Sequence, residues 1–221
     1  MEITLNLLVN LTCDMPKFAD AIHAVSNILR NGRLQHEIPE FQSHHIVDVS
    51  LHPSRLSLIK SMEQGFVGAE LGVAEGDFSK AILNEMKPEK LYLIDQWASR
   101  RYDQAEFNLV SAGVGAESNV EVIREDSITA LLQFPDEYLD FVYIDTTHSY
   151  EQTIDELRKS KSKVKKGGKI MGHDYTTGNP RRGLTYGVVQ AVHKFCVEED
   201  WRMSDLTLES NGFQSFALQE I

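Results

Sequence analysis

The sequence predicts an α/β protein with a doubly wound, mostly parallel sheet of seven strands and an N-terminal helical extension. Its length of 221 residues suits one α/β domain with an additional segment. From residue 65 onward, short and nearly continuous apolar runs alternate with amphipathic segments, as in strands buried on both faces. We therefore assign residues 1–64 to the extension and 65–221 to the sheet domain.

The extension contains two predicted helices. Apolar residues recur at helical spacing within residues 16–29, and a second, short helix is expected at 54–64. A polar stretch separates them. We interpret its adjacent His44 and His45 as surface residues of a loop rather than as metal ligands.

Strands and helices alternate in the sheet domain. Strands are expected at 66–71, 91–94, 120–123, 139–144 and 169–172, with two closing strands at 201–205 and 213–218. Helices are expected at 77–86, 102–113, 128–133, 150–164 and 183–197. Right-handed crossovers place the carboxyl ends of parallel strands along one edge, where ligands bind near the switch in strand order.

Composition narrows the class of protein. A formal net charge of −11 argues against a nucleic-acid partner, because binding phosphates requires clustered Lys and Arg. Cys13 and Cys196 lack metal-ligand spacing and are interpreted as reduced thiols, although the sequence leaves a bridge open. The sequence has no signal-peptide pattern and no apolar run near the roughly 20 residues that span a bilayer. We expect a cytoplasmic protein without a membrane partner, and a homodimer remains open.

A glycine-containing turn follows the first strand. Gly72 permits a tight turn, Gly76 lets a ligand approach the backbone, and the helix that begins near Asp77 presents free N–H groups. The pattern is neither G-x-G-x-x-G nor a P-loop. The carboxylates of Glu70, Glu75 and Asp77 would repel a pyrophosphate, whereas a zwitterionic amino acid with a sulfonium tolerates them better. An ordinary strand–helix loop is the alternative.

Carboxylates also follow the second and third strands. Asp95 comes about 20 residues after Gly72, the separation expected for a carboxylate that holds ribose hydroxyls. Asp126 either accepts a hydrogen bond from an adenine amino group or, like Ser127, caps the next helix. Trp97 either stacks near adenine or packs in the core.

This progression resembles the class I, S-adenosylmethionine-dependent methyltransferases, which have a Rossmann-like fold. The resemblance covers roughly residues 55–218. It rests on Glu70-x-Gly72 in the first motif, Asp95 after the second strand and Asp126-Ser127 after the third. It implies that Glu70, Gly72, Asp95 and Asp126 contact S-adenosylmethionine, and we add Gly76, Trp97 and Ser127 to the candidate cofactor-binding residues.

A second group of polar residues follows the fourth and fifth strands: Asp145, His148, His173 and Asp174. Unpaired buried charges are costly, and a divalent cation would satisfy several of them together. Two carboxylates and an imidazole suit Mg²⁺ and are compatible with Mn²⁺ or Fe²⁺. The alternatives are a helix cap at Asp145, a loop residue at His148 and a polar pair of His173 with Asp174. An Fe(II)-oxygenase triad of His148, His173 and Asp174 is also open.

Asp145-x-x-His148-x-Tyr150, followed by a helix and then residues 167–175, resembles the macrocin O-methyltransferase-like group of small-molecule methyltransferases. In that group the matching residues hold Mg²⁺, and the resemblance implies that Asp145, His173 and Asp174 bind a metal and that His148 takes the substrate proton. His173 stands where relatives usually have an acid, which favours Mn²⁺ or another transition metal and leaves open that no metal binds.

The sequence thus predicts metal-assisted O-methylation of a small hydroxylated substrate, a sugar or natural-product hydroxyl, with His148 and Asp145 as catalytic residues. A histidine with an ordinary pKa near 6.5 accepts a proton around neutral pH. A metal-dependent oxygenase or hydrolase, and an inactive binding subunit of the same fold, are the alternatives. The loop at 176–183 is either a lid whose Arg181 or Arg182 meets an acidic substrate or an exposed loop.

Overall fold

The computed structural model describes residues 38–221, so the predicted helix at 16–29 and Cys13 lie outside the described residues. Ile38–Thr177 and Tyr186–Ile221 belong to one compact unit, which contains the large sheet. Gly178–Thr185 is a separate part, a hairpin in which β7 (Gly178–Asn179) pairs antiparallel with β8 (Leu184–Thr185). No helix among the described residues is long and apolar enough to cross a membrane.

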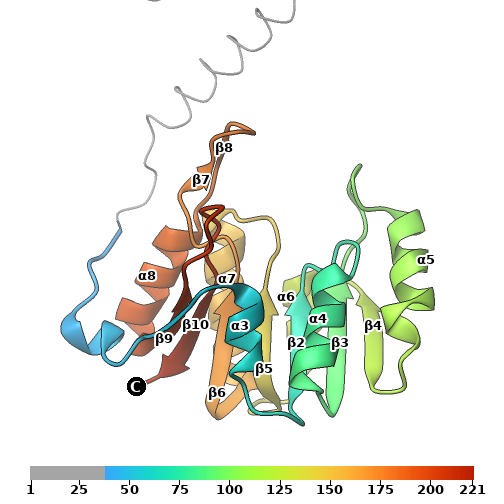
Figure 1. Cartoon of the computed structure of the whole chain (residues 1–221), viewed down its shortest axis with the longest axis horizontal. Helices are drawn as coiled ribbons and strands as arrows, with labels where there is room; N and C mark the ends of the chain where they lie inside the picture. The colour runs from blue at the N-terminus through green and yellow to red at the C-terminus, as the bar shows by residue number, and fades with distance from the viewer. Residues whose placement is uncertain (1–37) are drawn as a thin grey trace, which may run out of the picture. The chain divides into compact units, whose positions relative to one another are not determined.

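An eight-stranded sheet with the order β1-β9-β10-β6-β5-β2-β3-β4 forms the centre of the large unit (Figure 1). Neighbouring strands from β6 to β4 are parallel, and β10 is antiparallel to both β6 and β9. The strands are β1 Ser50–His52, β2 Val67–Leu71, β3 Lys90–Asp95, β4 Val120–Arg124, β5 Leu139–Ile144, β6 Val164–Gly172, β9 Trp201–Thr207 and β10 Phe216–Glu220.

The mostly parallel sheet confirms the predicted fold class, but the expected count of seven strands is one too low. The additional strand is β1, which pairs in parallel with β9 at the edge of the sheet. Its sequence is Ser-Leu-His, and Leu51 is 61% exposed. Backbone pairing rather than apolar burial therefore holds this strand, and no apolar run in the sequence indicates it.

Helices cover both faces of the sheet, and each face has its own apolar cluster. Residues from α6, α7 and α8 pack on one face, and residues from α3, α4 and α5 pack on the other. In β5, Val142 and Ile144 face the first cluster, and Phe141 and Tyr143 face the second, as the alternation of a strand requires. The helices are α3 Arg55–Lys60, α4 Asp77–Met86, α5 Gln104–Ala112, α6 Ser127–Leu131, α7 Tyr150–Lys163 and α8 Val188–Glu199.

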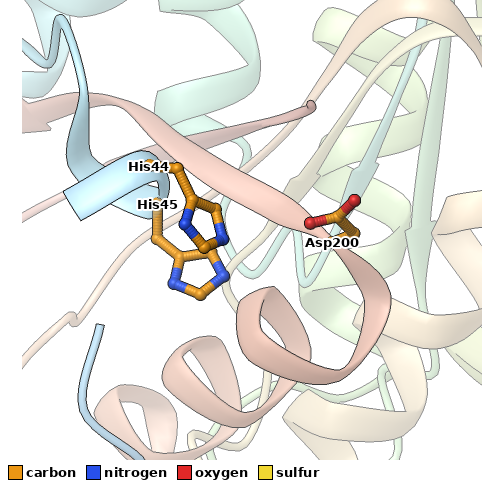
Figure 2. Close-up of side chains that lie close together, drawn as sticks. All are labelled: His44, His45 and Asp200. Atoms are coloured by element: carbon orange, nitrogen blue, oxygen red, sulfur yellow. The ribbon is translucent and has the colours of Figure 1, made fainter. Parts of the chain in front are cut away.

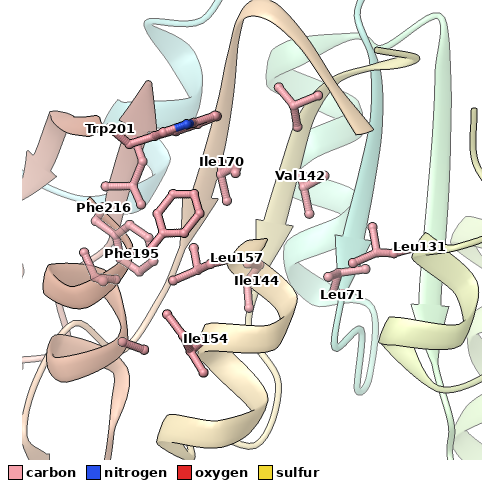
Figure 3. Close-up of a cluster of buried hydrophobic side chains, with 14 of the residues drawn as sticks. Leu71, Leu131, Val142, Ile144, Ile154, Leu157, Ile170, Phe195, Trp201 and Phe216 are labelled. Atoms are coloured by element: carbon pink, nitrogen blue, oxygen red, sulfur yellow. The ribbon is translucent and has the colours of Figure 1, made fainter. Parts of the chain in front are cut away.

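Figure 3 shows the first cluster, in which Ile154 and Leu157 of α7 and Phe195 of α8 lie against strand residues such as Ile144 and Ile170. All of these side chains are at most 5% exposed. Burial of apolar area at about 25 cal/mol per Å² drives this packing, which fixes the strands whose carboxyl ends carry the polar residues.

The last predicted helix begins too early. The sequence places its start at 183, whereas α8 begins at Val188 after the N-cap Gly187. A Cβ on Gly187 would lie 2.3 Å from the backbone N of Tyr150, so this glycine lets the chain pass close to the start of α7. The residues before it form the hairpin and the return to the large unit.

The order of the strands reverses between β2 and β5. From β2 the chain proceeds outward through β3 to β4, and it then returns to the other side of β2 with β5 and continues to β6. Parallel sheets of this kind bind ligands beyond the carboxyl ends of the strands at such a switch point. The topology therefore predicts a ligand site at the loops after β2, β3, β4 and β5.

Candidate functional site

The turn after β2 requires glycine. Gly72 has φ +87° and Gly76 has φ +77°, in the left-handed region that L-residues with a side chain rarely adopt. A Cβ on Gly72 would lie 2.1 Å from the backbone oxygen of Asp145. The turn after β2 therefore packs directly on the end of β5, and no larger residue fits there without movement of the backbone.

A cavity of about 330 Å³ opens at this switch point. It is lined by residues that follow β2, β3, β4 and β5, so the topology and the cavity agree. Among the predicted residues, the lining includes Gly72, Asp95, Asp126, Ser127 and Asp145. It also includes residues that the sequence analysis did not single out, among them Gln96, Tyr102, Thr146 and Gln152.

Asp95 holds the glycine turn in place. Its Oδ2 accepts hydrogen bonds from the backbone N–H groups of Val73 and Ala74, each at 3.0 Å, and its Oδ1 accepts from the backbone N–H of Trp97 at 2.8 Å. A carboxylate offers about four lone-pair sites. Asp95 therefore fixes the shape of the turn and keeps acceptor capacity for a ligand hydroxyl in the cavity that it lines.

Asp126 caps α6, which is one of its two interpretations from the sequence. Its Oδ1 accepts from the backbone N–H groups of Ile128 and Thr129 at 3.1 Å each. Its Oδ2 accepts from the side-chain amide of Gln96 at 2.9 Å. Asp126 also lines the cavity, so the capping role and contact with a ligand are compatible.

Glu70 and Trp97 lie in the interior and are not among the cavity-lining residues. Glu70 is 1% exposed and accepts a hydrogen bond from the Ser79 hydroxyl. Burial raises the pKa of Glu70 to about 8, because the cost of burying the charged carboxylate outweighs the opposing effect of that hydrogen bond. The Trp97 indole donates to the backbone oxygen of Ala74 at 3.0 Å and packs edge-to-face on Phe107, which matches the core-packing alternative.

The acidic residues and histidines after β5 and β6 come together as the sequence predicts. The His148 Nε2 lies 3.1 Å from Asp145 Oδ1 and 2.9 Å from Asp174 Oδ2. The His173 Nδ1 lies 3.3 Å from Asp174 Oδ1 and 3.9 Å from Asp145 Oδ2. We call these four residues the acid–histidine cluster. Since Asp145 also lines the cavity, the cluster adjoins it.

The charge state of His148 differs from the expectation of an ordinary pKa. Burial disfavours the protonated ring, but hydrogen bonds to Asp145 and Asp174 outweigh burial and raise the pKa of His148 to about 9. Burial alone would raise the pKa of Asp174, yet hydrogen bonds to His148 and His173 hold it well below its usual value. His148 is therefore an imidazolium between two carboxylates at neutral pH.

Arg55, at the start of α3, also reaches the cluster. Its Nη1 lies 3.6 Å from Asp145 Oδ2, and its guanidinium lies 4.3 Å from the centre of the Phe78 ring. The sequence assigns this residue to the extension, and only the local helix signal of Ser54, which caps α3, is visible there. No local pattern indicates that the arginine contacts a residue 90 positions away along the chain.

The ligand types of the cluster suit a divalent cation, but its charges are already paired. Ligand atoms of Asp145, His148 and Asp174 lie within 4.8 Å of one another. His148, rather than the predicted His173, completes this group. A metal bound here would therefore be coordinated by His148, the residue that the sequence assigns as the base. Two carboxylates face an imidazolium and a guanidinium, which removes the unpaired charge from which the sequence analysis inferred a cation.

A second histidine group lies away from the cavity. Figure 2 shows His44 and His45 close together beside Asp200. The expectation of surface residues is correct for His44 and wrong for His45, which is 2% exposed. The His45 Nδ1 accepts a hydrogen bond from the backbone N–H of Gln42 at 3.0 Å, so its Nε2 carries the proton in the neutral ring. This ring has no remaining lone pair for a metal.

Part of the chain matches a known family model, and its fold is similar to that of solved structures. Residues 69–175 match a family model described as a methyltransferase domain. No curated protein matches the chain. The S-adenosylmethionine-dependent methyltransferase of Aquifex aeolicus is 15% identical with a TM-score of 0.57, over 76% of this chain and 91% of that chain.

Two further solved structures are similar. Aeropyrum pernix fibrillarin, solved with natively bound S-adenosyl-L-methionine, is 14% identical with a TM-score of 0.53, over 74% of this chain and 72% of that chain. An O-methyltransferase family protein of Burkholderia thailandensis is 10% identical with a TM-score of 0.55, over 75% and 55% of the two chains. The chain thus has the Rossmann-like α/β fold of S-adenosylmethionine-dependent methyltransferases.

Proposed function

We propose that this chain transfers the methyl group of S-adenosylmethionine to a hydroxyl oxygen of a small molecule. The observation that carries the proposal is the continuity of two sites through Asp145, which lines the cavity and hydrogen-bonds to His148 in the acid–histidine cluster. A methyltransferase needs a donor pocket and a group that manages the acceptor proton next to it. The fold and the match to a methyltransferase domain support the donor.

The cavity residues suit the parts of the donor in the order of the strands. The backbone of the turn at Gly72 accommodates the methionine end, because this turn lines the cavity. Asp95 accepts hydrogen bonds from the ribose hydroxyls, and the loop at Asp126 and Ser127 holds the adenine. When bound, S-adenosylmethionine supplies an electrophilic methyl group on a sulfonium.

The acid–histidine cluster handles the proton of the acceptor. During transfer, the oxygen–hydrogen bond of the acceptor breaks and an oxygen–carbon bond forms. The neutral ring of His148 takes up the released proton and becomes the imidazolium, while Asp145 and Asp174 hold the ring in place. Because the pKa of His148 is raised to about 9, the fraction of chains with the neutral ring rises with pH toward that value. Alignment of the acceptor oxygen with the methyl group supplies much of the acceleration. Hydroxyl groups of sugars and of natural products are the acceptor class that the macrocin-like resemblance favours.

Metal assistance by Mg²⁺ or Mn²⁺ remains a prediction of the sequence, and the proposed step does not depend on it. The pairing of His148 and Arg55 with the carboxylates balances their charge without a further cation. Addition of a chelator during the activity assay separates the two versions. Activity that is lost with the chelator and restored by Mn²⁺ would return the metal to the mechanism.

The function is tested by measuring both cofactor binding and turnover in one variant, His148→Ala. We expect His148→Ala to bind S-adenosylhomocysteine within about threefold of the unchanged chain and to lose at least 100-fold in turnover, the lower end of what a general acid–base group contributes. Calorimetry measures the binding, and methyl transfer to a panel of sugars and phenols measures the turnover. His44→Ala, at an exposed position away from the cavity, is the control and should change neither.

Two results would contradict the proposal. Full turnover by His148→Ala would remove this residue from the reaction. Failure of the unchanged chain to bind S-adenosylhomocysteine would favour the alternatives, a metal-dependent oxygenase or hydrolase or an inactive binding subunit with this fold.

A further inference from the structure

A buried glutamate lies behind the cavity. Glu156 of α7 is fully buried, and its carboxylate accepts three hydrogen bonds from side chains. Ser127 Oγ and Gln152 Nε2 lie 2.6 and 2.9 Å from its Oε1, and Thr146 Oγ1 lies 2.8 Å from its Oε2. Burial raises the pKa of Glu156, and these three bonds oppose that rise. A buried carboxylate is costly, so this arrangement calls for a reason.

The three donors share a second property, which is that each of them lines the cavity. They come from three elements: Ser127 begins α6, Thr146 follows β5, and Gln152 lies in the first turn of α7. Glu156 thus connects three segments that meet at one wall of the cavity. We call Ser127, Thr146 and Gln152 the acceptor wall.

The carboxylate determines which atoms of the wall remain for a ligand. Gln152 Nε2 lies 2.9 Å from both Glu156 Oε1 and Ser127 Oγ, so the amide nitrogen faces these two acceptors and the carbonyl oxygen is the atom left over. The hydroxyl hydrogens of Ser127 and Thr146 are directed at Glu156, so their oxygens offer lone pairs. Because Oε1 accepts two of the bonds, the orientation of Gln152 holds even if Oε2 is protonated.

We propose that Glu156 is a positioning residue that turns this wall into a set of hydrogen-bond acceptors, so that the cavity selects a purine with a 6-amino group. The proposal rests on the proposed function, since it concerns the nucleoside of the methyl donor. Adenine presents an N–H donor at position 6, whereas hypoxanthine presents a carbonyl oxygen there. The acceptor wall accepts a hydrogen bond from the amino group of adenine, whereas it faces the carbonyl oxygen of hypoxanthine with acceptors that stay unpaired. Leaving buried polar groups unpaired discriminates between ligands more strongly than a difference in apolar contact does.

The test compares S-adenosylhomocysteine with its deaminated analogue, in which hypoxanthine has a carbonyl oxygen at position 6 and a hydrogen on N1. We expect the unchanged chain to bind the adenine ligand at least 30-fold more tightly. Glu156→Gln replaces one carboxylate oxygen by an amide N–H₂, so at least one wall residue must accept a hydrogen bond from position 156 instead of donating to it, and the hydrogen of that residue becomes free to face the ligand. We expect the Kd of the hypoxanthine ligand divided by the Kd of the adenine ligand to fall at least tenfold in this variant. Calorimetry measures both constants.

A matched control lies next to it in the same helix. Asp155 is exposed, and Asp155→Asn makes the same change of carboxylate to amide at the surface of α7. We expect the ratio to stay within twofold in this variant. Gln152→Leu provides a second test that keeps Glu156 unchanged, and it should weaken the adenine ligand at least tenfold while changing the hypoxanthine ligand by less than threefold.

The outcomes separate the inference from the function on which it rests. If the unchanged chain binds neither ligand, the proposed function fails, and this inference fails with it. If the unchanged chain binds the adenine ligand but Glu156→Gln and Gln152→Leu weaken both ligands equally, Glu156 only ties the three segments together. That result would overturn the inference alone and leave the proposed function in place. Should Glu156→Gln fail to fold, Gln152→Leu decides between these outcomes.

Discussion

Gly72→Ala tests the close packing of the turn after β2 against the end of β5. The new Cβ would lie 2.1 Å from the backbone oxygen of Asp145, and this oxygen cannot rotate away as a side chain would. The residue also has φ +87°. Left-handed backbone costs a residue with a Cβ roughly 1–2 kcal/mol, and forced overpacking costs about 1–3 kcal/mol more. We expect a loss of roughly 2–5 kcal/mol in the free energy of unfolding.

Gly65→Ala is the matched control for this prediction. Gly65 has nearly the same backbone conformation, φ +83°, but a Cβ there meets nothing within 4 Å among the described residues. Gly65→Ala should therefore lose only the cost of the left-handed backbone, roughly 1–2 kcal/mol in the free energy of unfolding. The difference between the two variants isolates the contact with the end of β5.

Thermal unfolding and ligand binding measure the effect. For a chain of this size, each kcal/mol shifts Tm by about 2–4 °C, so we expect a drop of roughly 10 °C for Gly72→Ala and roughly 4 °C for Gly65→Ala. Binding of S-adenosylhomocysteine should be lost only in Gly72→Ala. Equal changes in Tm and binding for the two variants would refute the close packing of this turn.

The remaining predictions concern two carboxylates and an indole. The pKa of Glu70 is raised to about 8 in the folded chain, from an ordinary 4.5, so its contribution to stability is present below pH 4.5 and is lost as the pH rises toward 8. Glu70→Gln should therefore reduce the loss of stability between pH 5 and pH 8 in urea titrations, and an unchanged slope would contradict this. Asp95→Ala removes the acceptor of three hydrogen bonds, two from the turn after β2 and one from Trp97, and we expect at least tenfold weaker binding of S-adenosylhomocysteine with a lower Tm; binding at full strength would show that the carboxylate is dispensable. Trp97→Phe removes the indole hydrogen bond to Ala74 and should cost about 1 kcal/mol in the free energy of unfolding with little change in binding, whereas a large loss of binding would favour stacking on the ligand.

The sequence predicted those elements whose signal is local. The helix at 77–86 and the strand at 139–144 have the predicted bounds, because the first follows a glycine turn and the second is apolar except at Asp140. Strand β1 escaped prediction because backbone pairing with β9 holds it and its Leu51 is largely exposed. The start of α8 was misplaced because Gly187, rather than the earlier Gly183, stands at its N-cap.

The candidate site shows the same division. Asp95, Asp126 and Asp145 could be found because each follows an apolar strand, and parallel strands bring their carboxyl ends together. Glu156 and Arg55 could not be found, because Ser127 and Thr146, which bond to Glu156, and Asp145, which pairs with Arg55, lie outside the helices that carry these two residues. The high pKa of His148 was equally out of reach, since it depends on two carboxylates from different loops.

Titration of the full chain with S-adenosylhomocysteine by calorimetry, alongside Asp95→Ala, tests the proposed donor site most directly. The account predicts binding at a one-to-one ratio in the unchanged chain and at least tenfold weaker binding in the variant. Absence of binding in the unchanged chain, or equal affinity in both, would contradict the assignment of this cavity to an adenosyl sulfonium donor.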